Sequence, residues 1–121
     1  MPSPIVHVEL VAADPAKAAQ FYGEVFGWNL QHDPSFDYHM FSADPGPGGG
    51  FVKAGESGGV EYKVGEPLLY IGTDDIEGTL ERIEAHGGKR LLPKTEIPGI
   101  GWFAIFLDPA GNKMALYTQL S

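Results

Sequence analysis

The chain lacks cysteine, has few positive charges and has no long apolar run, and each absence excludes a class of protein. Without a cysteine among its 121 residues it has no disulfides, no thiolate catalysis and no thiolate-bound metal. Lys and Arg number 8 against 16 Asp and Glu, a net charge of −8, so we expect neither nucleic acid nor an anionic membrane surface as a partner. No apolar stretch approaches the roughly 18–20 residues of a membrane span, and no signal-peptide pattern is visible at the start. These absences predict a cytoplasmic location.

The rest of the composition is typical of a folded domain with many turns. A hydrophobic share of 43% and a charged share of 20% are ordinary for a globular protein. The 17 glycines and 10 prolines favour short strands and turns over a helical bundle. We therefore expect one globular domain with substantial β-structure.

The first 27 residues predict a strand, a helix and a stop. Residues 5–11 are rich in β-branched residues and read as a strand, with His7 and Glu9 on the same side. Asp14 has the position of an N-cap, with proline directly after it, and Gly27 is a natural helix stop. The expected apolar face of this helix comprises Ala18, Phe21, Tyr22, Val25 and Phe26.

The same order returns 61 residues later and indicates an internal repeat. Residues 67–71 read as a strand, Asp75 as a second N-cap, and Gly87-Gly88 as the end of a second helix. The shift aligns Leu10 with Ile71, Asp14 with Asp75, Ala19 with Leu80, Tyr22 with Ile83, and Gly27 with Gly88.

Short strands are expected after each helix. Their predicted ranges are 28–32, 38–42 and 51–54 in the first half, and 89–92, 102–107 and 113–118 in the second. The glycine-rich residues 46–59 are interpreted as a mobile loop. We expect a single domain, residues 1–121, with module one at about 4–54, a linker at about 55–66 and module two at about 67–119.

A turn at residues 108–112 predicts the register of the last two strands. It pairs Leu107 with Lys113, Ile105 with Ala115, and Phe103 with Tyr117. Because side chains alternate along a strand, these pairs share one face, and Phe106 and Met114 pack under a helix on the other.

These features together resemble the vicinal oxygen chelate superfamily, which includes glyoxalases, bleomycin-resistance proteins and extradiol dioxygenases. The resemblance rests on His7, on the capped helix with Phe26-Gly27-Trp28 at its exit, on Asp75, and on Asp108-Pro109-Ala110-Gly111-Asn112 before the last strand. It implies an α+β fold in which two βαβββ modules form a curved, cup-like mixed sheet with the helices outside. It also implies a homodimer.

The resemblance gives four positions at which the family's metal enzymes place ligands, on the first and last strands of each module. His7 occupies the first. Leu68 and Ala115 occupy the two positions of module two, and Gly50 or Phe51 the remaining one. Only His7 can ligate, so we expect no metal cofactor. A divalent metal is the alternative, held by His7 and Glu9 with a third ligand from His32 or His39.

Two hypotheses for the function follow from the resemblance. The first is a protein that binds a small apolar or aromatic molecule in its cup. The second is a lyase, isomerase or dioxygenase in which His7 and Glu9 are metal ligands or one of them is a general base. In either case His7 and Glu9 are the polar candidate residues. The candidate ligand-binding walls are Leu68, Tyr70, Phe103, Ile105 and Tyr117.

The other histidines, His32, His39 and His86, are interpreted as surface or loop residues. Glu9 is unusual, because an inward-facing carboxylate costs several kcal/mol unless a partner or water solvates it. Tyr70, its counterpart in the repeat, is the partner that the sequence suggests.

Overall fold

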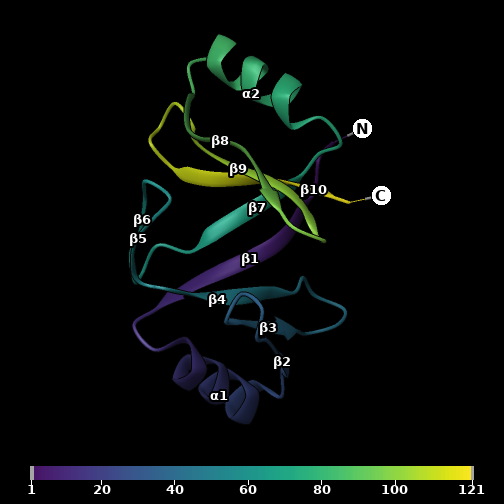
Figure 1. The fold of residues 1–121 in the computed structure, drawn as a ribbon, viewed down its shortest axis with the longest axis vertical. Helices are drawn as coiled ribbons and strands as arrows, with labels where there is room; N and C mark the ends of the chain where they lie inside the picture. The colour runs from purple at the N-terminus through teal and green to yellow at the C-terminus, as the bar shows by residue number, and fades with distance from the viewer. Residues whose placement is uncertain (1, 121) are drawn as a thin grey trace. The chain divides into compact units, whose positions relative to one another are not determined.

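The computed structural model describes residues 2–120, which form two compact units. The N-terminal unit comprises residues 6–68, and the C-terminal unit comprises the residues from 69 onward together with those before residue 6. Each unit contains a four-stranded mixed sheet with one helix against it (Figure 1). The predicted α+β class is therefore confirmed.

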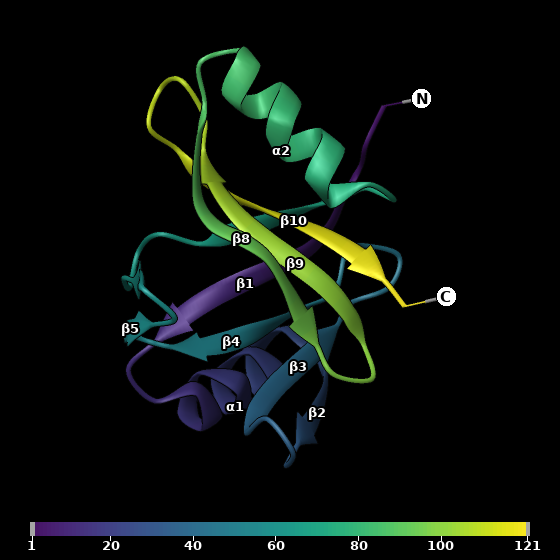
Figure 2. The same ribbon diagram turned by 45° about the horizontal axis from the view of Figure 1, so that its top comes forward.

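The N-terminal unit has a sheet of strand order β2-β3-β4-β1, in which β4 runs parallel to β1. Helix α1 lies against one face of this sheet (Figure 2). Its elements are β1 (Ile5–Ala12), α1 (Pro15–Phe26), β2 (Asn29–Asp33), β3 (Tyr38–Ser42), β4 (Gly49–Lys53), β5 (Gly55–Ser57) and β6 (Val60–Tyr62).

The core of the N-terminal unit lies between α1 and the sheet. Ala19, Phe41 and Phe51 are its buried residues. The predicted apolar face of α1 is partly wrong, because Phe21, Val25 and Phe26 are exposed. The buried stripe instead passes through Ala19, with Ala18 and Tyr22 beside it. Each residue advances about 100° around a helix, so Phe21, two residues after Ala19, lies on nearly the opposite side, whereas Phe26 is on the side of Ala19 but is the last residue of the helix.

The glycine-rich residues 46–59, expected to form a loop, contain strands β4 and β5. Gly49 and Gly50 are buried in β4, and a Cβ at Gly49 would lie 1.8 Å from the Val8 carbonyl oxygen. These two glycines therefore permit close approach of neighbouring groups. Residues 55–62, which fall in the expected linker, form the hairpin β5–β6, and Val60 of this hairpin is buried.

The C-terminal unit repeats this arrangement with strand order β7-β10-β9-β8 and β10 parallel to β7. Its elements are β7 (Leu68–Gly72), α2 (Ile76–Ala85), β8 (Lys89–Ile97), β9 (Gly101–Leu107) and β10 (Lys113–Gln119). The predicted register of β9 and β10 is confirmed. Strand β8 is longer than expected, because register irregularities on both sides of Leu92 accommodate Pro93, which has no N–H to donate.

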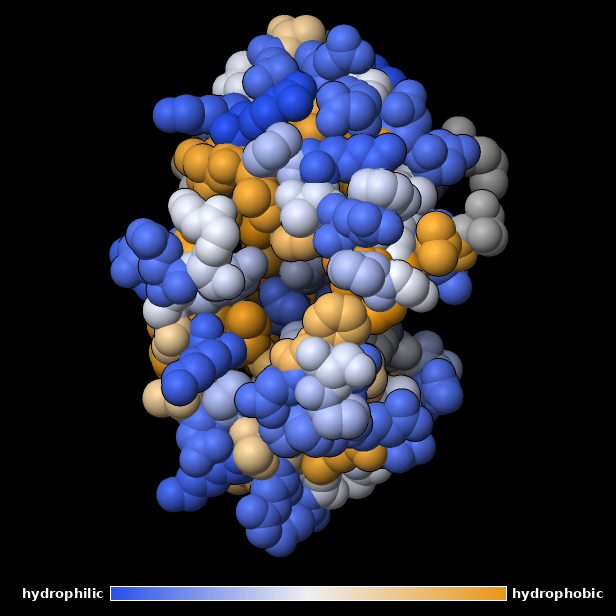
Figure 3. Space-filling view, in the orientation of Figure 1, coloured by the Kyte–Doolittle hydropathy of each residue, from blue (hydrophilic) through white to orange (hydrophobic). Residues whose placement is uncertain are grey.

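Helix α2 buries Ile76 and Leu80 against the sheet, where Phe106 and Leu116 lie in the same cluster. The end of the molecule that carries α2 is covered mainly by hydrophilic side chains (Figure 3). Arg90 donates two hydrogen bonds to Glu84 there. No helix in residues 2–120 combines the length and apolarity needed to cross a membrane.

The two helices begin in the same way, as the 61-residue shift predicts. The Asp14 carboxylate accepts from the Lys17 N–H at 3.2 Å, and the Asp75 carboxylate accepts from the Gly78 N–H at 3.0 Å. Gly27 ends α1 with a left-handed φ of 72°, and Gly87, with φ 93°, follows the last turn of α2. The predicted caps and stops are confirmed.

Replacing either cap should lower stability by a similar amount. Asp14→Ala and Asp75→Ala each remove the acceptor for one unpaired helical N–H, which costs about 0.5–2 kcal/mol. Urea unfolding measures this free energy. Asp74→Ala removes a neighbouring exposed acid without a capping bond and should change it little; an equal loss in Asp74→Ala would contradict the capping role.

Candidate functional site

The candidate site lies on the face of the N-terminal sheet that α1 does not cover. Val8 and Leu10 of β1 pack in the helix-side cluster, so His7 and Glu9 project from the opposite face. Glu9 is the one buried charged residue of the described chain, with 6% of its surface exposed. The predicted shared face of His7 and Glu9 is therefore present.

Tyr38 reaches these two residues from β3, across the intervening strand β4. Gly50 of β4 pairs with Glu9 on one side and with Met40 on the other. A Cβ at Gly50 would lie 2.0 Å from the Tyr38 hydroxyl oxygen and 2.1 Å from the ring carbon that bears it. Only glycine therefore leaves room for the ring of Tyr38 to cross β4.

The Tyr38 hydroxyl joins the histidine and the carboxylate. It donates to Glu9 Oε2 at 2.6 Å, and His7 Nε2 lies 3.0 Å from the same oxygen. Because the tyrosine proton is used toward Glu9, the bond with His7 requires Nε2–H as the donor. Neutral His7 is then the Nε2–H tautomer, with Nδ1 as an acceptor.

Burial determines the charge state of the surrounding groups. Burial lowers the pKa of His7, which keeps the ring neutral at neutral pH. Burial, and secondly the negative charge of Glu9, raise the pKa of Tyr62 in the β5–β6 hairpin to about 12. The site therefore combines a carboxylate with a neutral imidazole and neutral phenols.

The five predicted wall residues share the helix-free face of the C-terminal sheet. Ala115 pairs with both Tyr70 and Ile105, and Tyr117 pairs with Phe103, so all of these project from one side. Leu68 lies two residues before Tyr70 on the same strand and is buried. Tyr117 is partly exposed, and burial raises the pKa of its hydroxyl.

The strand register resolves the fourth ligand position that the sequence left open. Gly50 pairs with Glu9 across parallel strands, as Ala115 pairs with Tyr70. Gly50, not Phe51, is thus the equivalent of Ala115. The four positions carry His7, Gly50, Leu68 and Ala115.

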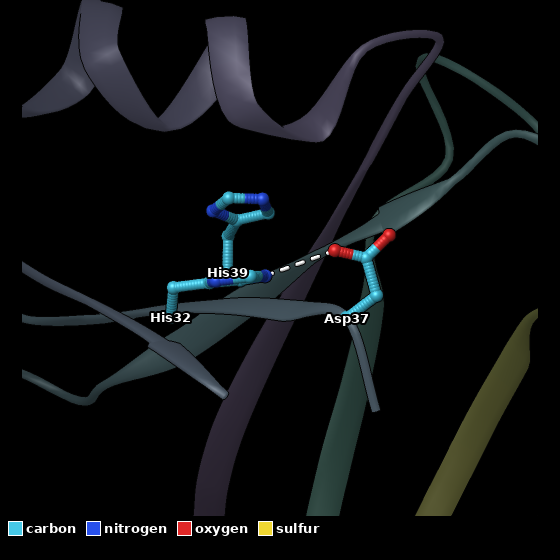
Figure 4. Close-up of side chains that lie close together, drawn as sticks. All are labelled: His32, Asp37 and His39. Atoms are coloured by element: carbon cyan, nitrogen blue, oxygen red, sulfur yellow. Dashed lines mark hydrogen bonds and ion pairs between the residues drawn. The ribbon is translucent and has the colours of Figure 1, made fainter. Parts of the chain in front are cut away.

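The structure also brings together polar residues that the sequence analysis did not connect. Tyr38 is a partner of Glu9 that the sequence did not suggest, and the expected contact of Glu9 with Tyr70 stays a prediction. The sequence feature that could have indicated this contact is Gly50, because a glycine beside Glu9 in a sheet leaves space for a large side chain from the next strand. His32 and His39 lie on the predicted strands, and with Asp37 they form a group on the α1 side of the sheet (Figure 4).

Comparison with known proteins agrees with the family resemblance seen in the sequence. A family model described as Glyoxalase/Bleomycin resistance protein/Dioxygenase superfamily matches residues 4–116. A glyoxylase-like domain-containing protein of Didymella fabae is 33% identical over 120 residues, covering 93% of this chain and 91% of that protein. The anthracycline biosynthesis protein DnrV of Streptomyces peucetius is 29% identical over 92% of this chain; the chain spans 45% of its length.

A solved structure extends the similarity to the fold. It is a superfamily member from Vibrio splendidus 12B01, with a TM-score of 0.66 and 18% identity. The match covers 98% of this chain and 100% of that one. At this identity the likeness concerns the fold.

Removing the Tyr38 hydroxyl should destabilise the protein. Tyr38→Phe removes the hydroxyl that donates to Glu9 Oε2 at 2.6 Å, at a cost of about 1–3 kcal/mol. Gly50→Ala should cost at least as much, because the new Cβ displaces the Tyr38 ring. Denaturant unfolding measures both; Tyr117→Phe and Gly46→Ala are the matched controls. Wild-type stability in Tyr38→Phe would show that the network contributes nothing.

Stability should fall as the pH drops below the ordinary histidine range. The pKa of His7 lies below its unfolded value of 6.5, so the unfolded state binds more protons in acid. The contribution of His7 to stability is complete above pH 6.5 and declines as the pH falls below this value. The loss of stability in acid should be smaller in His7→Gln than in the wild type. In His86→Gln, a substitution on the surface, the loss should be as large as in the wild type. Identical pH profiles in wild type and His7→Gln would refute the assignment.

Proposed function

Because the chain belongs to the glyoxalase/bleomycin resistance protein/dioxygenase superfamily, we propose that it binds a small, largely apolar or aromatic molecule without the usual metal centre. His7, Tyr38 and Glu9 are its polar anchors. Small-molecule sites combine apolar lining with a few fixed polar groups, and this set fits the polar part of such a site.

The observation that carries the proposal is the placement of Glu9. A carboxylate that only supports a fold is seldom buried, because its desolvation costs several kcal/mol. Glu9 is 6% exposed on the face that no helix covers, and Tyr38 donates to it at 2.6 Å. Such a preorganised acceptor is suited to a donor group of a ligand, for example a hydroxyl or an amine.

The residues present do not fit the family's metal. A catalytic metal needs about three protein ligands and an open position. Gly50, Leu68 and Ala115 have no ligating atoms, and His7 uses Nε2 toward Tyr38. We therefore propose a metal-free site and derive no reaction step through a metal.

For the C-terminal unit we propose the helix-free face as an apolar ligand-binding surface. Phe103 and Tyr117 are its partly exposed rings, and Ile105, Tyr70 and Leu68 are buried beside or below them in the sheet. Aromatic rings on such a surface favour flat, apolar ligands.

A second candidate function is metal-free general base catalysis by Glu9. The observation in its favour is the 2.6 Å bond from Tyr38, which orients the carboxylate. The base would remove a proton from an acidic C–H, as isomerases and lyases do. The neutral His7, through Tyr38, would hold the carboxylate in one orientation.

Ligand mapping by NMR tests the proposed function. The probes are small aromatic compounds, with an anthracycline among them because one relative is named for anthracycline biosynthesis. We expect amide shifts at residues 7–9, 38 and 50 and saturable binding that Glu9→Gln weakens by about tenfold, about 1.4 kcal/mol. His86→Gln is the matched control.

Two results distinguish binding at this site from binding elsewhere, and a binding protein from an enzyme. Shifts confined to residues outside the helix-free faces would contradict the binding site. For a bound probe with an acidic C–H, loss of its proton signal in D₂O that Glu9→Gln abolishes would establish the base; retention of the signal would leave a binding protein.

A further inference from the structure

A second group of polar side chains lies on the β2–β3 hairpin, on the opposite face of the sheet from Glu9. It comprises His32, Asp37 and His39 (Figure 4). One ring nitrogen of each histidine and one oxygen of Asp37 all lie within 4.8 Å of one another. His32 Nε2 lies 2.9 Å from Asp37 Oδ1, and this hydrogen bond is the main cause that lowers the pKa of Asp37.

The hairpin itself brings these three side chains together. His32 and His39 are directly paired across the antiparallel strands, so their side chains share a face, and their rings stack at 4.3 Å. Asp37 ends the connecting loop in the left-handed region, at φ 47°, which aspartate tolerates better than most residues. The Asp33 side chain caps the same loop by accepting from the Ser35 N–H at 2.9 Å.

Two imidazoles and a carboxylate are a ligand set for borderline divalent metals. Bonds of about 2.0–2.2 Å at tetrahedral angles hold ligand atoms roughly 3.3–3.6 Å apart, so any pair of ligand atoms that lies further apart must come closer. His32 and Asp37 are exposed side chains and can make this adjustment by rotation. The metal would also replace the proton shared between His32 and Asp37.

A cavity of about 730 Å³ adjoins two of the three residues. Asp37 and His39 contribute to its lining, together with the start of α1 and residues 51–57, all within the N-terminal unit. The charged side chains of the lining are Asp14, Asp37, Lys53 and Glu56. Three acids against one base favour a cation there.

We propose that His32, Asp37 and His39 bind one divalent transition-metal ion of the zinc, nickel or cobalt class. Its remaining coordination positions face the cavity, where water or a small anionic ligand completes them. This site is separate from the His7–Tyr38–Glu9 network, which lies on the other face of the same sheet.

Metal titration of the full chain tests this site. After treatment with a chelating resin, the protein is titrated with Co²⁺ and Zn²⁺ by calorimetry, and Co²⁺ is also followed by its visible absorption. We expect one ion per chain, with His32→Gln, Asp37→Asn and His39→Gln each weakening binding by at least about tenfold, because each removes one of three ligands. Histidine side-chain NMR should show nitrogen shifts at His32 and His39 upon Zn²⁺ addition.

The controls locate the ion. His86→Gln removes an exposed histidine of α2, and His7→Gln removes the histidine of the other face; both should bind metal as the wild type does. Absence of binding, or loss of binding in His7→Gln with retention in His32→Gln and His39→Gln, would overturn the proposal.

Discussion

The short bond from the Tyr38 hydroxyl to Glu9 is the interaction on which the rest of the site depends. A buried carboxylate needs donors, and the donor comes from β3, two strands away from β1. The Tyr38 side chain can cross the intervening strand β4 only at a residue that has no side chain, and this residue is Gly50. The same hydroxyl then makes His7 the donor through Nε2. This one bond thereby explains both the need for a glycine at position 50 and the tautomer of His7.

The two faces of each sheet carry different sets of side chains. In both units the helix-side face carries the apolar core, with Phe41 and Phe51 in one and Leu80 and Leu116 in the other. The helix-free faces also carry buried residues, among them Glu9 in the N-terminal unit and Ile105 in the C-terminal unit. Two small residues, Gly50 and Ala115, occupy equivalent positions on these faces.

The fold was largely predictable because its signals are local and repeated. Two aspartate caps separated by 61 residues, each followed by a helix and a glycine stop, specify both modules. Strand β4 was not fully predicted in the glycine-rich segment, because glycine can mark a flexible loop or a place where neighbouring groups come close. Gly49 and Gly50 are of the second kind. The exposure of Phe26 could not be read from spacing, since Phe26 lies seven residues after Ala19 and so on the same side of the helix.

The candidate site was half predictable. The shared face of His7 and Glu9 follows from the alternation of side chains along a strand, which depends only on residues close in sequence. Tyr38 does not, because its contact with Glu9 joins residues 29 apart and depends on the register of three strands. The pairing of His32 with His39 depends in the same way on hairpin register, which a four-residue connection leaves open in sequence. Long-range pairing is thus the information that the structure adds.

Side-chain NMR of the His7 ring is the most direct test of the network. Long-range proton–nitrogen spectra at neutral pH distinguish the two neutral tautomers and the charged form. The account predicts a neutral His7 with its proton on Nε2, and a change in that signal in Tyr38→Phe. A His7 that is protonated on Nδ1 alone, or that is charged, and whose signal is the same in Tyr38→Phe, would contradict the bond on which the site is built.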